Sequence, residues 1–197
     1  MDTYKNIPTY HAPNRQAWRS WLSANHSLVA AVWLIIYRKE SGTPSVYYPE
    51  AVDEALCFGW IDSKPNKRDA DSYYVYFSKR NPKSNWSGVN KQKVEKLLAE
   101  GLMTEAGLAM ITLAKATGTW NALQTVDSLE EPADLREAFN QNPEARQQWE
   151  GFAPSARRGI LEWILNAKRP DTRQKRISQT VALAAEGKKA NFPAGKT

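Results

Sequence analysis

The first sixty residues alternate between amphipathic stretches and short apolar runs. A polar start at Asn14, followed by Trp18, Trp21 and Leu22 on one side, predicts a helix that ends near residue 25. The run LVAAVWLIIYRKE is rich in β-branched and aromatic residues, which predicts a strand, and the SGTP that follows predicts a turn. Pro49 suits the first turn of a second helix, over PEAVDEALCF.

Beyond this second helix the pattern predicts two more strands and then helices. Gly59 breaks the helix, and WIDS and SYYVYFSK are typical of strands joined by the polar segment KPNKRDAD. Two helices follow, one from a capping residue at Ser84 to Gly101 and one between Thr104 and Gly118. Strands in one part of the chain and helices in the rest predict an α+β fold class, with helices packed on an antiparallel sheet.

The remainder of the chain is predicted to be helical. The connector VDSLEEPAD is followed by periodic segments at about residues 133–140, 143–150, 155–168 and 171–186. We therefore expect an α+β domain over residues 1–124, a helical domain over 125–190 and a frayed tail over 191–197.

Composition is that of a globular protein, with 42% hydrophobic and 24% charged residues in 197. A single cysteine excludes an internal disulfide framework and a zinc site built from several cysteines. The N-terminus lacks the pattern of a signal peptide, and the longest apolar run is too short to span a membrane. These features predict a cytoplasmic protein without a membrane span.

Charge is unevenly distributed along the chain. The net charge is +6, with basic excesses over residues 1–100 and 155–197 on either side of an acidic stretch. Such a distribution is compatible with an anionic partner, and equally with solvated helix faces.

The chain also resembles a known family. The runs YPEAVDEALCFGWIDS and PKSNWSGVNKQKVEKLLAEGLMTEAG resemble the bacterial YdeI/OmpD-associated family, and the part beginning PADLREAFNQNPEARQQWEGF looks like that family's helical bacteriocin-protection module. The resemblance implies an N-terminal domain related to the YjbR/CyaY (frataxin-like) fold. It also implies a role in stress resistance or in resistance to bacteriocins or antimicrobial peptides. It brings no set of catalytic residues and no cofactor.

Cys57 is the first candidate for chemistry, because it lies between acidic residues. Its place near the C-terminal end of a helix disfavours a thiolate, and Asp53 one turn earlier would raise the thiol pKa further. We therefore interpret Cys57 as a packed residue. Iron binding of the frataxin type needs carboxylates along the first helix, where Arg15 and Arg19 stand instead, so we expect no metal site.

Cations gathered before the predicted helix start at Ser84 form a candidate site for an anion or nucleic acid. Free N–H groups at a helix start and nearby cations favour a phosphate, and a tryptophan beside them could stack on a base. The surface consists of Lys79, Arg80, Lys83, Ser84, Trp86, Asn90 and Lys91. The alternative is that Trp86 packs in the core and the cations are only solvated.

The last predicted helix carries a second basic face. Arg173 and Arg176 lie on its polar side, opposite Ile177 and Val181 on the docking side. Two interpretations of this face stay open: it binds an anion together with the first surface, or it is only solvated.

Trp60 and Asp62 are the candidates for a small-molecule pocket. We thus predict a non-enzymatic protein that binds an anionic ligand or a partner. A nucleic-acid-binding protein, a small-molecule-binding protein or enzyme, and a protein-interaction adaptor remain as alternatives.

Overall fold

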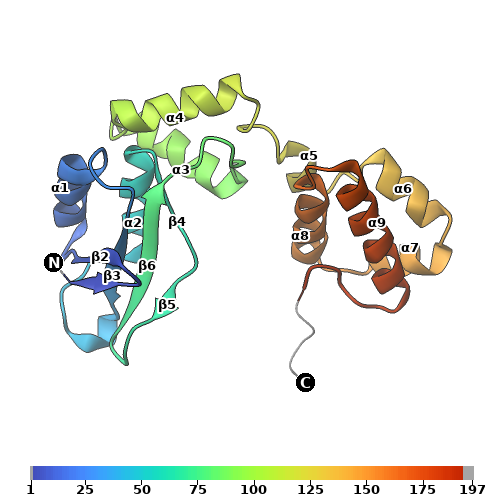
Figure 1. The fold of residues 1–197 in the computed structure, drawn as a ribbon, viewed down its shortest axis with the longest axis horizontal. Coiled ribbons are helices and arrows are strands. Elements are labelled where there is room, and N and C mark those ends of the chain that lie inside the picture. The colour runs from blue at the N-terminus through green and yellow to red at the C-terminus, as the bar shows by residue number, and fades with distance from the viewer. Residues whose placement is uncertain (1, 193–197) are drawn as a thin grey trace. The chain divides into compact units, whose positions relative to one another are not determined.

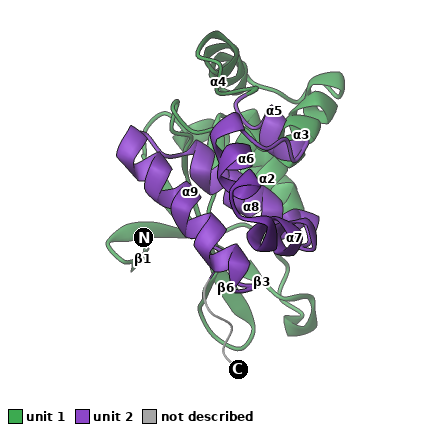
Figure 2. Ribbon diagram, turned by 90° about the vertical axis from the view of Figure 1, so that its right-hand side faces the viewer, with its two compact units in different colours: residues 1–121 green, residues 122–197 purple. Residues whose placement is uncertain are grey.

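The computed structural model describes residues 2–192. The chain forms two compact units, Met1–Asn121 and Ala122–Thr197 (Figure 2). The first unit combines a sheet with helices and the second is helical, which confirms the predicted α+β fold class (Figure 1).

The sheet of the first unit has the strand order β1-β2-β3-β6-β4, with β5 also paired to β6. Its pairs are antiparallel except β2 with β3, which run parallel. Among the described strands the sheet is thus antiparallel, as predicted, except at this one pair. The strands are β1 (Thr3–Tyr4), β2 (Ile7–His11), β3 (Ala31–Tyr37), β4 (Trp60–Asp62), β5 (Asn66–Lys67) and β6 (Ser72–Lys79).

Alternation along β3 gives the sheet two different faces. Val32, Leu34 and Ile36 are buried on the inner face, together with Val75 and Phe77 of β6. Helices α1 (Arg15–Asn25) and α2 (Tyr48–Cys57) cover that face (Figure 1). The intervening residues of β3 point to the opposite, outer face.

Local signals fix both of these helices as predicted. The Asn14 side chain accepts a hydrogen bond from the Ala17 N–H at 2.8 Å and caps α1. Pro49 lies in the first turn of α2. Gly59 has φ +71°, a left-handed conformation that glycine adopts readily, and it turns the chain from α2 into β4.

Helix α3 (Gly88–Ala99) begins later than predicted. Ser87 caps it by accepting from the Asn90 N–H at 3.3 Å, whereas the hydroxyl of Ser84 bonds the Asn81 carbonyl. A turn around Asn81 takes up the residues that were expected to be the first turn of the helix. The next helix, α4 (Glu105–Ala116), follows Thr104 and stops before Gly118, as predicted.

The second unit is built from α5 (Gln124–Asp127), α6 (Ala133–Asn140), α7 (Pro143–Glu150), α8 (Pro154–Leu165) and α9 (Pro170–Ala185). The last four match the predicted segments closely, whereas the single-turn helix α5 was not predicted. Their core includes Leu135, Phe139, Trp149 and Ile160.

Two residues beyond α9 contact the rest of the second unit. Ala190 is buried, and the ring of Phe192 lies over Gly159. Residues 191 and 192 of the predicted tail are exposed, and its residues 193–197 lie outside the described part. Within the described residues, no helix has the length and apolar character needed to cross a membrane.

Candidate functional site

Cys57 is a packed residue at the end of α2. Its side chain is fully buried, and its carbonyl accepts from both the backbone N–H and the hydroxyl of Thr104. Burial raises the pKa of the thiol to about 11, and the charge of Glu54 adds to this effect while Arg19 opposes it. The acid that acts on the thiol is thus Glu54, where the sequence had indicated Asp53. A thiol in this state is not an activated nucleophile.

Glu54 is held by the two arginines of α1. Its carboxylate is buried and accepts from Arg15 Nε and Arg19 Nη1, each at 2.6 Å. Asp53 is paired separately with Lys93. Among the residues that the structure describes, no group of three or more His, Cys, Asp or Glu side chains is placed to hold a metal ion.

The predicted anion surface of residues 79–91 is not assembled as expected, because its centre is buried. Arg80 is 5% exposed and lies over the Trp86 ring, 3.8 Å from the ring centroid. Desolvation lowers the pKa of Arg80 to about 10, and the guanidinium donates to the Asn85 carbonyl. Trp86 is 2% exposed and packs on Trp120. Neither side chain is available to a base or a phosphate.

The other members of that surface are engaged locally or dispersed. Lys79 Nζ donates to the Ser27 carbonyl at 3.0 Å, and Lys91 Nζ lies 5.9 Å from the Trp120 ring centroid. Because α3 starts late, its first N–H groups lie beside Ser87, and the side chain of Ser87 already accepts a hydrogen bond from the backbone N–H of Asn90. Lys83 remains exposed on the preceding turn. The helix start that was to join these residues therefore does not exist at residue 84.

The basic side of α9 is also largely occupied. Arg173 donates to the two carboxylate oxygens of Asp134 at 2.6 and 2.8 Å. Arg176 donates to the Trp163 carbonyl, and its guanidinium lies 4.9 Å from the centroid of the Trp163 ring. Both arginines thus tie helices of the second unit together, so neither guanidinium is free in the way that the anion-binding interpretation of this face assumed.

Trp60 and Asp62 have separate roles. Trp60 belongs to the core, and its indole N–H donates to the His26 carbonyl at 3.3 Å. The carboxylate of Asp62 accepts a hydrogen bond from the Tyr48 hydroxyl. Trp60 therefore cannot line a pocket, whereas Asp62 is bonded to a residue that does.

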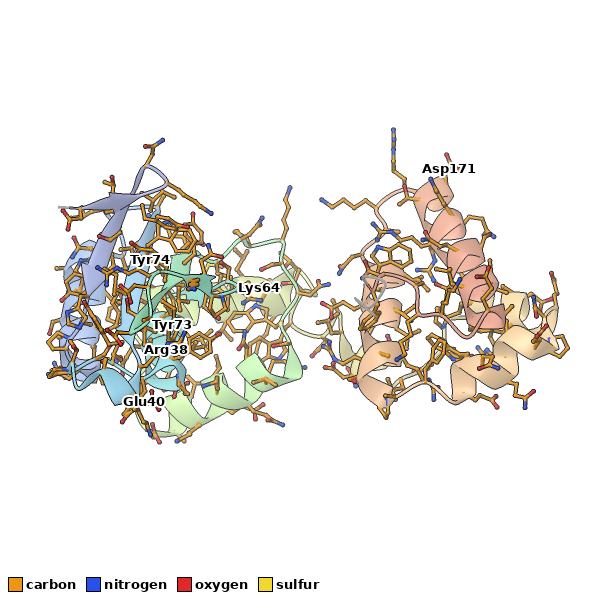
Figure 3. The ribbon with its side chains drawn as sticks, turned by 90° about the horizontal axis from the view of Figure 1, so that it is seen from below. Arg38, Glu40, Lys64, Tyr73, Tyr74 and Asp171 are labelled. Carbon is orange, nitrogen blue, oxygen red and sulfur yellow. The ribbon has the colours of Figure 1, made fainter. Side chains whose placement is uncertain are left out.

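Tyr48 lines an open groove of about 430 Å³ at the end of the sheet, formed by Arg38, Tyr48, Pro65, Asn66, Lys67 and Tyr73. The Arg38 guanidinium lies beside the Tyr73 ring, 5.9 Å from its centroid (Figure 3). We call this the Arg38 groove.

The Arg38 groove is cationic and offers hydrogen-bond donors. Across residues 2–192, no carboxylate forms an ion pair with Arg38 or Lys67. Burial raises the pKa of Tyr48, as does its hydrogen bond to Asp62, and burial also raises the pKa of Tyr73. Both phenols therefore keep their protons at neutral pH and add no negative charge. The groove thus presents the positive charges of Arg38 and Lys67, two aromatic rings and the Asn66 amide. This combination suits an anionic group attached to a flat or apolar body.

The sequence did not reveal this groove because its residues are distant along the chain. Arg38 follows β3, whereas Lys67 and Tyr73 come from the β5–β6 region. The available signals were the polar segment KPNKRDAD and the cation directly after an apolar strand. Neither signal predicts their meeting without the β5–β6 pairing, in which Lys67 lies opposite Tyr73.

Two family models match separate parts of the chain. Residues 10–110 match a domain of unknown function, DUF8412, and residues 128–187 match the family described as bacteriocin-protection, YdeI or OmpD-associated. No curated protein and no solved structure matches the chain. The resemblance to the YdeI/OmpD-associated family is thus supported in the second unit, whereas kinship of the first unit with YjbR/CyaY proteins stays a prediction.

Proposed function

Because the chain belongs to the DUF8412 family and carries a YdeI/OmpD-associated domain in its second unit, we propose that it is a binding protein for a small anionic ligand. The ligand occupies the Arg38 groove of the first unit. The proposed cellular role is resistance to bacteriocins, antimicrobial peptides or related stress, in keeping with the description of the matched C-terminal family.

One observation carries this proposal: Arg38 and Lys67 line the same groove, and neither is neutralised by a carboxylate among the described residues. Most other arginines of the first unit already have polar partners, as Arg15 and Arg19 have in their ion pairs with Glu54. A guanidinium presents paired donors that match a phosphate or carboxylate, and an ammonium adds a second point charge.

The rest of the groove indicates what kind of anion it accepts. Tyr73 offers a ring face beside Arg38, and Pro65 adds apolar surface. A ligand with a charged group and a planar or apolar body would use both features, whereas a bare inorganic ion would use only the cations. We place this activity in the cytoplasm, since a single unpaired cysteine suits a reducing compartment.

Isothermal titration calorimetry with inorganic phosphate, nucleoside monophosphates and aromatic carboxylates tests the proposal. We expect at least one of the organic anions to bind more tightly than phosphate and to raise the melting temperature. Arg38→Gln and Lys67→Gln should each weaken binding by about tenfold, because each removes a charge-assisted hydrogen bond.

Lys83→Gln is the matched control. It removes an exposed cation from the turn that the sequence had indicated as an anion site. The affinity of this variant for the anion should stay within about twofold of that of the wild type, a change much smaller than the loss of a charged hydrogen bond would cause. The proposal fails if none of these anions binds, or if Lys83→Gln weakens binding as much as Arg38→Gln.

A further inference from the structure

The outer face of the sheet carries a cluster of aromatic side chains. Trp33 of β3 lies opposite Tyr76 of β6, and their ring centroids are 5.0 Å apart. Tyr74 belongs to the same face, and Tyr4 from the N-terminal hairpin stacks on it at 4.2 Å with an interplanar angle of 9°. Tyr37 continues the cluster along β3. We call these five residues the aromatic face.

Much of this cluster is accessible within the first unit. Trp33 is buried beneath its neighbours, whereas the side chains of Tyr4, Tyr37, Tyr74 and Tyr76 are only half-buried. The helices α1 and α2 pack on the inner face, where Val75 and Phe77 of β6 point. The aromatic face therefore presents several ring surfaces side by side on a rigid strand pair, as a stacking platform requires.

Cations flank the aromatic face. Lys5 Nζ lies 5.2 Å from the Tyr4 ring centroid and 5.8 Å from that of Trp33. The Arg68 guanidinium lies 5.8 and 5.9 Å from the rings of Tyr37 and Tyr74. Arg68 forms an ion pair with Asp69 at 3.2 Å and donates to the hydroxyls of Tyr37 at 3.2 Å and Ser72 at 3.0 Å, and the side chains of Arg68 and Asp69 are partly exposed. Lys5 forms no ion pair among the described residues.

This arrangement favours one chemical class of partner. Rings that accept flat bases, bordered by positive groups that accept phosphates, are complementary to single-stranded nucleic acid. A neutral sugar would use the rings but gain little from Lys5 and Arg68. A duplex keeps its bases stacked inside and would not reach the rings.

We propose that the aromatic face binds single-stranded nucleic acid, with bases stacked on Tyr4 and Tyr76 and phosphates contacted by Lys5 and Arg68. This surface is distinct from the Arg38 groove, because Tyr73 of that groove packs with the inner core whereas Tyr74 points outward. The proposal therefore stands or falls independently of the anionic ligand.

Fluorescence anisotropy with labelled oligo-dT and oligo-U of about 20 nucleotides tests it on the full chain. Binding should be detectable at about 50 mM salt and weaken towards 200 mM. With two phosphate contacts the logarithmic salt slope should be about −1.4, since each contact on a single strand contributes about −0.7. The corresponding duplex should bind more weakly.

Variants separate stacking from bulk effects. Tyr76→Leu keeps an apolar side chain but removes the ring, and it should weaken binding by roughly fivefold to 100-fold. Tyr76→Phe keeps the ring and should bind nearly as the wild type does. Lys5→Gln, at an exposed hairpin turn, should reduce the salt slope by about 0.7 with no effect on folding.

Lys83→Gln and Arg38→Gln are the controls, because they remove cations of the turn and of the Arg38 groove. Both should leave oligonucleotide binding unchanged. The proposal is overturned by the absence of binding at low salt, by equal affinity of Tyr76→Leu and wild type, or by an equal loss in Lys83→Gln. Binding of neutral oligosaccharides instead of oligonucleotides would also overturn it.

Discussion

Replacement of Glu54 by glutamine should destabilise the first unit strongly. The Glu54 side chain is 2% exposed, and its two oxygens accept separate hydrogen bonds from Arg15 and Arg19. Arg19 also donates to the Leu102 carbonyl, which connects α1 to the segment before α4. Glutamine has nearly the same shape but no charge, so the variant leaves two guanidinium groups without their counter-ion.

The expected loss follows from how buried each partner is. The Arg15 side chain is 38% exposed, so water can solvate it again and its share is that of a surface pair, up to about 1 kcal/mol. The Arg19 side chain is 26% exposed, and its charged hydrogen bond contributes about 1.5–3 kcal/mol. The free energy of unfolding should therefore fall by about 1.5–4 kcal/mol.

Urea unfolding combined with hydrogen exchange and mass spectrometry measures this loss. Exchange in peptides of α1 and α2 assigns it to the first unit, because the two units need not unfold in one transition. A double-mutant cycle of Glu54→Gln with Arg19→Gln should give a coupling energy of about 1 kcal/mol or more.

Glu100→Gln provides the matched control. Its pair with Lys96 spans 3.8 Å, with side chains 42% and 70% exposed, so the change should stay within about 0.5 kcal/mol. The reasoning is refuted if Glu54→Gln unfolds like this control, or if the two substitutions of the cycle are additive.

Three further predictions concern buried positions. As pH rises from about 9 to 11, the wild type should lose about 2–3 kcal/mol of stability that Cys57→Ala does not lose, because the unfolded thiol, with an ordinary pKa of 9.0, gives up its proton before the buried thiol does. Urea unfolding of both proteins across this pH range checks the prediction, and an equal dependence of stability on pH in the two proteins contradicts it. Gly107→Ala should destabilise α4 by about 1–3 kcal/mol, because its methyl group would overlap the Cys57 carbonyl, whereas Gly151→Ala meets only ordinary contacts and serves as the thermal-melting control. Arg80→Ala should lower stability by about 2 kcal/mol through loss of its contact with Trp86, and it should leave the affinity for anions unchanged. Weaker anion binding by this variant would support the anion site that the sequence predicted around residues 79–91.

Helices were predictable where their signals are local. Asn142 caps α7 and Pro143 follows it at the first position, and the structure keeps both features. The β2–β3 pairing was not predictable in the same way, because it joins residues more than twenty positions apart in parallel register. The start of α3 shifted because Ser87 and Ser84 offer the same capping chemistry, and only the turn at Asn81 decides between them.

The candidate site was harder to predict than the fold. Arg80 was expected outside because arginine is seldom buried, yet the Trp86 ring and the Asn85 carbonyl accommodate it in the interior. Arg173 and Arg176 form a polar face in the sequence of α9, but their partners Asp134 and Trp163 lie on other helices. Net charge and periodicity describe which side chains are polar, whereas their availability depends on contacts that only the folded chain defines.

The double hydrogen bond from Thr104 to the Cys57 carbonyl has a mechanical consequence. Together with the close approach of Gly107, it fastens the end of α2 to the start of α4, so we expect these two helices to move together. Tyr48 lies at the other end of α2, whereas Lys67 lies on the largely exposed connection between β4 and β6. The Arg38 groove is thus bordered on one side by a helix anchored at its far end and on the other by a short connection, and we expect a wider ligand to be accommodated on the side of the β4–β6 connection.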